Sequence, residues 1–232
     1  MIVVLGYHKV GAPIFKKEDR RLNASPEGFA RQVNWFRRRG WQAPTPSQLA
    51  NNHFDPKRNT VVFTFDDAYE KTVETAAPIL QAAGFTGSFF AVSSMVGQNS
   101  QWDGDRGTPL ADWPTLKKWA EQGFAIDNHS RTHCWNAKLS ADELEAEVMD
   151  AEEAIFANIG MRSKVFCYPY GFYNKQVLDT LRKHDYTVSF TVKRGFVTPE
   201  SPRLELPRVM VAYSDGLMGL LYRLYLRPKL GR

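Results

Sequence analysis

The sequence is poor in cysteine, in long apolar runs and in leader signals. Its two cysteines, Cys134 and Cys167, are too few for a disulfide framework or a cysteine-rich zinc site. No apolar run reaches the roughly 18 residues that a membrane-spanning helix needs. The first ten residues, MIVVLGYHKV, contain neither a basic segment nor a small-residue cleavage site. As given, the chain is therefore expected to be cytoplasmic, and extracytoplasmic if a leader has been trimmed.

Positive charge is concentrated near the end of the sequence. The chain has 30 Lys and Arg against 25 Asp and Glu, and residues 216–232 contain four of the basic residues and no carboxylate. Nucleic-acid-binding proteins usually carry basic residues across a whole face, so no nucleic-acid partner is expected. The segment 217–230, LMGLLYRLYLRPKL, predicts a basic amphipathic helix at about 214–228. Such a helix either packs on the domain or makes peripheral contact with a membrane.

What the sequence does contain is an alternation of short apolar runs and amphipathic segments. Its 43% hydrophobic content is ample for a single domain over residues 1–232. Four helix starts carry a capping residue: Ser25, Asp112, Ser140 and Asn174. The alternation predicts a parallel α/β sheet, open or closed into a barrel. The predicted strands are 2–8, 60–65, 86–92, 123–127, 163–168, 186–192 and 208–213.

Ionisable and turn-forming residues follow four of these runs. They are His8, the pair Asp66 and Asp67, the segment 127–129 and the segment 169–171. In parallel α/β folds the carboxyl ends of the strands meet at one face, where functional sites are built. We therefore expect these residues to share one site.

Two short patterns among them suit metal chemistry. Of the adjacent carboxylates Asp66 and Asp67, one can bind a cation while the other acts as a base, although a turn and helix cap would look the same. His129 and His133, in HSRTH, can face one divalent metal; the alternative is two surface histidines. One carboxylate and two imidazoles leave open positions for water and substrate, which is typical of a catalytic metal.

Three motifs together resemble a known family. TFDDAY (64–69), HSRTH (129–133) and YPYG (168–171) occur in the order and at the intervals of the polysaccharide deacetylase family, the NodB homology domain of carbohydrate esterase family four. The resemblance covers about residues 60–215. It implies an α/β fold, a distorted (β/α) barrel of about seven parallel strands, which agrees with the seven runs.

The resemblance also implies roles for individual residues. A divalent metal, usually zinc, would be held by Asp67, His129 and His133, and Asp66 would be the general base. The backbone N–H of Tyr170 would bind the oxyanion. The implied reaction removes N-acetyl groups from an N-acetylhexosamine-containing glycan and gives acetate and a free amino sugar.

The chain departs from the family pattern in two places. Many members have an arginine two positions before the Pro-Tyr pair, where this chain has Cys167. The late Leu-x-x-His motif that supplies the general acid is absent, since no histidine follows His184. In the permuted poly-N-acetylglucosamine de-N-acetylases the acid lies on an N-terminal strand, and LGYHKV (5–10) resembles that motif. His8 would then be the acid; a strand-end histidine bound to backbone is the alternative.

Residues beside the motifs are candidates for contact with substrate. Trp135 directly follows the second metal histidine, and Phe172 follows the turn that begins at Pro169. Aromatic faces pack against the C–H surfaces of sugar rings, so we expect these residues to line the substrate site. Arg208 is included as well, either in place of the missing arginine or in a structural salt bridge.

Two other functions fit the same residues. One is a deformylase or deacetylase acting on a lipid-linked amino sugar or a small amide. The other is a catalytically inactive carbohydrate-binding homologue, suggested by Cys167 and the missing late histidine. Because both carboxylates and both imidazoles are present, we favour the enzyme, with an N-acetylated oligo- or polysaccharide, free or lipid-linked, as its partner.

Overall fold

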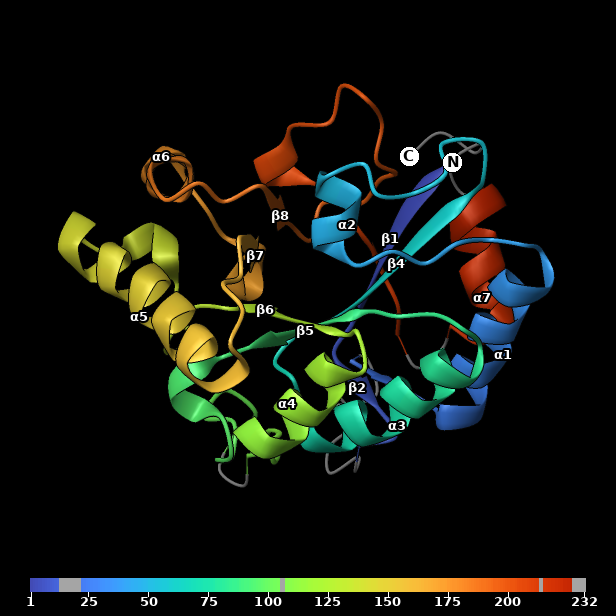
Figure 1. Cartoon of the computed structure of the whole chain (residues 1–232), viewed down its shortest axis with the longest axis horizontal. Coiled ribbons are helices and arrows are strands. Elements are labelled where there is room, and N and C mark those ends of the chain that lie inside the picture. The colour runs from blue at the N-terminus through green and yellow to red at the C-terminus, as the bar shows by residue number, and fades with distance from the viewer. Residues whose placement is uncertain (13–21, 105–106, 213–214, 227–232) are drawn as a thin grey trace.

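The computed structural model describes residues 1–12, 22–104, 107–212 and 215–226, which form one curled parallel sheet with helices around it (Figure 1). The strand order is β8-β7-β6-β5-β4-β1-β9, and every pairing is parallel. Each of the seven predicted runs overlaps one strand, so the predicted distorted barrel is confirmed. The strands are β1 (Ile2–Tyr7), β4 (Thr60–Phe65), β5 (Ser88–Ala91), β6 (Ala125–Asn128), β7 (Val165–Cys167), β8 (Val188–Phe190) and β9 (Val209–Met210).

The helices begin where the capping residues predict. Ser25, Asp112, Ser140 and Asn174 each accept a backbone N–H in the first turn of the next helix. Helix α2 was not predicted from the sequence, although Thr45 and Gln48 form a capping box there. The helices are α1 (Pro26–Arg38), α2 (Pro46–Ala50), α3 (Glu70–Ala82), α4 (Trp113–Glu121), α5 (Ala141–Ile159), α6 (Lys175–Lys183) and α7 (Leu217–Leu221). A short two-stranded sheet, β2 (Lys9–Val10) and β3 (Asn23–Ala24), was also not predicted.

Both faces of the sheet are buried, as the continuous apolar runs require. On the outer face, Leu5 and Phe63 pack with Phe36 and the other apolar residues of the surrounding helices. On the inner face, Val4 and Val62 belong to a separate cluster that fills the barrel. The alternation along each strand therefore separates a helix-facing core from a barrel interior.

One extended segment near the end of the chain closes the barrel. The Leu206 N–H donates to Ser189 in β8, while Val209 in β9 pairs with Leu5 in β1. The segment thus contains the edge strand β9 and contacts the opposite edge strand, β8. Arg208 lies between these two contacts and is fully buried.

The C-terminal helix packs along α1 (Figure 1). Leu220 and Leu224 are buried against the core, in α7 and in the π-helical turn Tyr222–Leu226 that continues it. The predicted helix at about 214–228 is thus present over 217–226. Residues 215 and 216 precede the helix, and residues 214, 227 and 228 lie outside the described residues. Arg223 pairs with Asp215 at 2.9 Å. Among the described helices, none is long and apolar enough to span a bilayer.

Candidate active site

Polar residues from separate strands meet at the carboxyl-terminal face of the sheet. Asp66 follows β4, His8 follows β1, and His129 follows β6. The Asp66 N–H donates to the Tyr7 carbonyl at 2.8 Å, which continues the β1–β4 ladder to the point where both side chains emerge. The parallel sheet therefore gathers residues that lie far apart in the sequence, as the strand-end pattern predicts.

Asp67, His129 and His133 converge in a buried cluster. Asp67 Oδ1 lies 3.4 Å from His129 Nε2 and 3.2 Å from His133 Nε2. It has no hydrogen-bond partner among the described residues. His129 Nδ1 lies 2.8 Å from the Cys167 carbonyl, an acceptor only, so Nδ1 carries the proton and Nε2 presents its lone pair to Asp67. Three lone-pair donors aimed at one point fit a divalent cation.

A second group of potential ligands fits a metal less well. Asp66, His129 and Cys167 also place ligand atoms within 4.8 Å of one another. Both carboxylate oxygens of Asp66, however, are bound by Arg208. The first group, one carboxylate and two imidazoles, is also the donor set that suits zinc with an open coordination position.

A buried glutamate in α5 holds the loop between the two histidines. Glu147 accepts the N–H groups of Arg131 and Thr132, at 3.0 and 2.9 Å, and the Thr132 hydroxyl at 2.8 Å. The sequence analysis did not single out Glu147. A signal for it was present, because Glu147 lies on the buried helix face of Leu144 and Val148, where an ionisable residue needs a partner.

Backbone strain is concentrated at this site. Five of the non-glycine residues with positive φ in the described chain are Asp67, Ala68, Ser130, His133 and Tyr170, with φ between 50° and 68°. Such residues are uncommon, and each costs of order 1–3 kcal/mol. The surrounding fold therefore holds the TFDDAY motif, the HSRTH motif and the Pro-Tyr turn in backbone conformations that non-glycine residues disfavour.

Arg208 holds the other carboxylate in a bidentate ion pair. Its Nη1 and Nη2 lie 2.6 Å and 2.8 Å from the two oxygens of Asp66. Its Nε donates to the Thr191 carbonyl at 3.0 Å, and Nη2 lies 3.2 Å from Cys167 Sγ. Burial by itself raises the pKa of Asp66, but the Arg208 guanidinium beside it lowers that pKa to about 2. Asp66 is therefore an ionised, fixed carboxylate at neutral pH.

This geometry does not fit the expected contact of Arg208 with substrate. The Arg208 side chain has no exposed surface and lies behind Asp66. The sequence left two roles open for Arg208: replacement of the missing family arginine, or a structural salt bridge. The position of Arg208 behind Asp66 favours the replacement. Cys167 stands where other family members have that arginine, and its thiol and carbonyl contact Arg208 and His129 respectively.

His8 approaches Asp66 from the mouth of the site. Its Nε2 lies 3.8 Å from Asp66 Oδ2, and the side chain is 22% exposed. The backbone carbonyl of His8 accepts the Thr72 hydroxyl, but the ring makes no hydrogen bond to backbone within the described ranges. The imidazole is therefore available to a bound substrate, unlike a histidine fixed by the backbone.

Aromatic side chains surround the mouth. Tyr170, Trp135 and Phe172 are exposed, and the Phe172 ring lies 5.1 Å from Trp135. Pro169 is buried and shapes the turn that presents them, rather than facing the mouth itself. The Trp102 ring, on the loop between β5 and α4, lies 4.0 Å from the His133 ring. That loop reaches the site in the structure.

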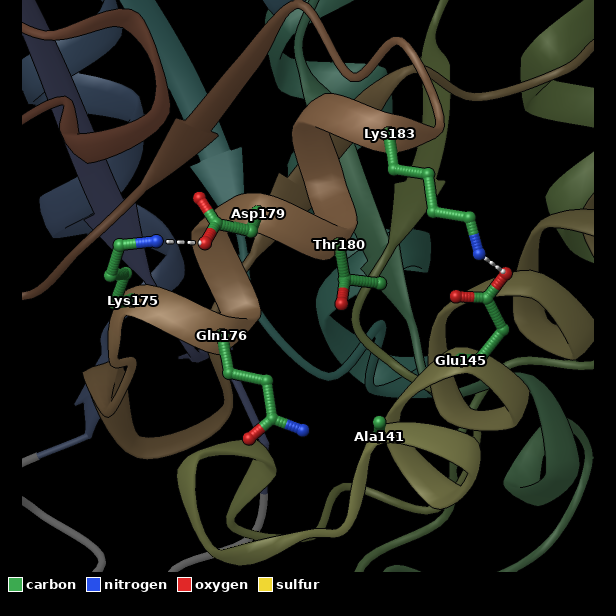
Figure 2. Close-up of a pocket in the computed structure, with 7 residues that line it drawn as sticks. All are labelled: Ala141, Glu145, Lys175, Gln176, Asp179, Thr180 and Lys183. Atoms are coloured by element: carbon green, nitrogen blue, oxygen red, sulfur yellow. Dashed lines mark hydrogen bonds and ion pairs between the residues drawn. The ribbon is translucent and has the colours of Figure 1, made fainter.

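A separate surface pocket of about 560 Å³ lies between α5 and α6 (Figure 2). Its lysines are neutralised, since Lys175 pairs with Asp179 and Lys183 with Glu145. None of the residues that line it belongs to the Asp67 cluster or to the Asp66 pair. The candidate active site is therefore the strand-end cluster.

Comparison with known proteins agrees with these features. Residues 53–189 match the family model described as polysaccharide deacetylase. Over 240 residues the chain is 24% identical to the poly-beta-1,6-N-acetyl-D-glucosamine N-deacetylase of Staphylococcus aureus strain MRSA252, a match that covers 95% of this chain and 82% of that protein.

Solved structures share the fold. The Streptococcus pyogenes deacetylase PplD in complex with acetate superposes with a TM-score of 0.83 at 20% identity, covering 96% of this chain and 97% of that one. IcaB from Ammonifex degensii gives a TM-score of 0.80 at 20% identity, covering 96% of each chain. Because the family model matches more than half of the sequence, this chain belongs to the polysaccharide deacetylase family.

Proposed function

We propose that this protein is a metal-dependent hydrolase that removes N-acetyl groups from an N-acetylhexosamine-containing glycan. The observation that carries the proposal is the buried cluster of Asp67, His129 and His133 directly beside the Asp66 carboxylate and the His8 imidazole. This arrangement supplies a cation site, a base and an acid within one mouth. An amide needs all three, because water is a weak nucleophile and an amine is a poor leaving group.

The cluster would hold a divalent ion, with zinc as the proposed metal. When bound, such an ion polarises the amide carbonyl and acidifies water. Asp66, kept ionised and oriented by Arg208, accepts a proton from the attacking water. The hydroxide oxygen forms a bond to the carbonyl carbon, and the carbonyl π electrons move to its oxygen.

Two further groups serve the tetrahedral intermediate. The Tyr170 N–H has no acceptor among the described residues, so we assign it to the oxyanion. His8, when protonated, donates a proton to the sugar nitrogen as the C–N bond breaks. The products are acetate and the free amino sugar, and the proton on Asp66 is released to solvent.

Three observations support a glycan as the substrate. Trp135 and Phe172 extend an aromatic surface beyond the reacting cluster, which a small amide would not use. The S. aureus relative is named for poly-beta-1,6-N-acetyl-D-glucosamine, and PplD was solved with acetate. A lipid-linked amino sugar stays an alternative source of the same acetamide group.

The experiment that tests the proposal is mass spectrometry of glycans incubated with the zinc-loaded full chain. N-acetylglucosamine oligomers with β-1,4 and β-1,6 linkages are expected to lose acetyl groups, with release of an equal amount of acetate. N-formyl oligomers presented in parallel test the deformylase alternative. Glycan binding without any acetate would overturn the proposal and would indicate an inactive binding protein.

The Arg208→Gln variant is expected to lose stability and turnover together. Removing one partner of a buried ion pair typically costs about 3–5 kcal/mol, which corresponds to at least about 6 °C in Tm for a chain of this size. Asp66 has a pKa of about 2 when folded, so the ion pair stabilises the protein above pH 4 and this contribution is lost as the pH falls toward 2. The Tm difference between wild type and Arg208→Gln should therefore grow as the pH rises from about 2 to about 4 and stay near its full value up to pH 7.

Thermal denaturation across this pH range checks the expectation. The matched control is Arg182→Gln, because the ion pair of Arg182 with Asp179 is exposed and should contribute little. A pH-independent Tm difference, or Tm losses that are equal in the two variants, would contradict the assigned role of Arg208.

A further inference from the structure

The outer face of the C-terminal helix is apolar and exposed. Met218, Tyr222 and Leu226 are spaced four residues apart and are 77%, 44% and 56% exposed. Leu220 and Leu224, on the opposite side, are buried in the core. One face of the helix therefore packs in the core, whereas the exposed apolar face of Met218, Tyr222 and Leu226 has no partner within the described chain.

Three arginines from a distant part of the sequence lie at the end of this face. Tyr225 packs against Trp35 of α1 at 5.9 Å, and the Arg39 guanidinium lies 4.1 Å above the Trp35 ring. Arg37, Arg38 and Arg39 are exposed, and none has a carboxylate within 4.0 Å among the residues that the structure describes. The fold thus joins a cationic cluster to an apolar stripe, a combination that the sequence of the tail alone does not show.

The arginine end of this surface lies near the end of the barrel opposite the mouth. After α1 the chain reaches Gln42, which pairs with Thr60, the first residue of β4. The arginines at the end of α1 are therefore next to the starts of the strands, whereas Asp66 and His8 follow the strand ends. Figure 1 shows α1 and α7 side by side along the same edge of the barrel.

We propose that this surface binds an anionic lipid bilayer. The apolar stripe would enter the interface, and the arginines would contact lipid phosphates, which is how basic amphipathic helices bind membranes. A second copy of the chain is a poorer occupant, because a symmetric contact would place like charges opposite each other.

The apolar stripe runs along α7, so lipid contact would turn the side of the barrel formed by α1 and α7 toward the bilayer. The lipid contact does not rest on the proposed function.

Co-sedimentation of the full chain with vesicles tests the proposal. Binding is expected to vesicles of phosphatidylcholine with phosphatidylglycerol, to weaken with added salt, and to be lost with phosphatidylcholine alone. The triple variant Arg37→Gln, Arg38→Gln, Arg39→Gln should bind about 10²-fold more weakly. The double variant Met218→Ser, Leu226→Ser should also bind more weakly, without loss of metal or of Tm.

The matched control replaces three exposed lysines elsewhere, Lys71, Lys117 and Lys118, with glutamine. It removes the same charge from α3 and α4 and should leave vesicle binding nearly unchanged. Equal loss in both triple variants would show a general charge effect and would overturn the proposed surface. So would absence of binding to anionic vesicles, or concentration-dependent dimerisation abolished by the Met218 and Leu226 substitutions. Deacetylase activity is measured separately, so its absence would not affect this result.

Discussion

The Asp66→Asn variant is expected to bind zinc as the wild type does and to lose about 10²- to 10⁴-fold or more in kcat. The reason is the division of labour between adjacent carboxylates, because Asp67 faces the two imidazoles while Asp66 faces Arg208 and His8. An asparagine keeps the shape of the side chain and removes its ability to accept a proton. Atomic absorption measures the zinc content, and kcat on a chito-oligosaccharide measures the loss of turnover.

The complementary variants are Asp67→Ala, His129→Ala and His133→Ala. Each should lower bound zinc and activity together, since each removes one of three ligands. Asp66→Asn also leaves Arg208 without its carboxylate, so its Tm must be measured to separate lost chemistry from lost folding. Near-normal turnover by folded Asp66→Asn would show that the base has been assigned to the wrong residue.

The His8→Ala variant is expected to keep its metal and its Tm but to lose about 10²- to 10⁴-fold in kcat on an unactivated acetamide. The sugar amine leaves only when its nitrogen is protonated, and His8 is the imidazole that contacts Asp66 from the partly exposed side. An activated acetate ester needs little protonation of its leaving group. The His8→Ala variant should therefore lose far less kcat on such an ester than on the amide.

The loss of kcat on the amide, divided by the loss on the ester, shows whether His8 acts as an acid. Equal losses on amide and ester would point to binding or folding instead of acid catalysis. A His8→Ala protein without metal would make His8 a ligand and leave the acid to be found elsewhere. His53→Ala is the matched control, because His53 is exposed on a loop and should affect neither substrate.

Local and periodic features of this protein were predictable from its sequence. Most strand runs are rich in β-branched and aromatic residues, and the caps at Ser25 and Ser140 act within one helical turn. The gathering of His8, Asp66 and His129 was also predictable, because parallel strands present their carboxyl ends on one face. These inferences depend on short-range chemistry and on one topological rule.

Other parts of the site depend on contacts between residues far apart in the sequence, which no local sequence pattern predicts. The contact between Asp66 and Arg208 joins residues 142 positions apart, and it exists because the segment through Leu206 closes the barrel. Trp102 reaches His133 from an irregular loop whose path has no periodic signal. Glu147 differs, because its position on an apolar helix face could have predicted a buried role. Arg223 pairs with the nearby Asp215 carboxylate, a contact that the amphipathic pattern of the tail does not encode.

The closing segment also sets the order in which the site is completed during synthesis. The proposed metal ligands end at position 133, whereas Arg208 directly precedes β9, the last strand of the sheet. A nascent chain still attached to the ribosome exposes every ligand before the guanidinium that orients the base has been added. Until Arg208 joins the fold, Asp66 has no guanidinium partner and the proposed hydrolytic arrangement is incomplete.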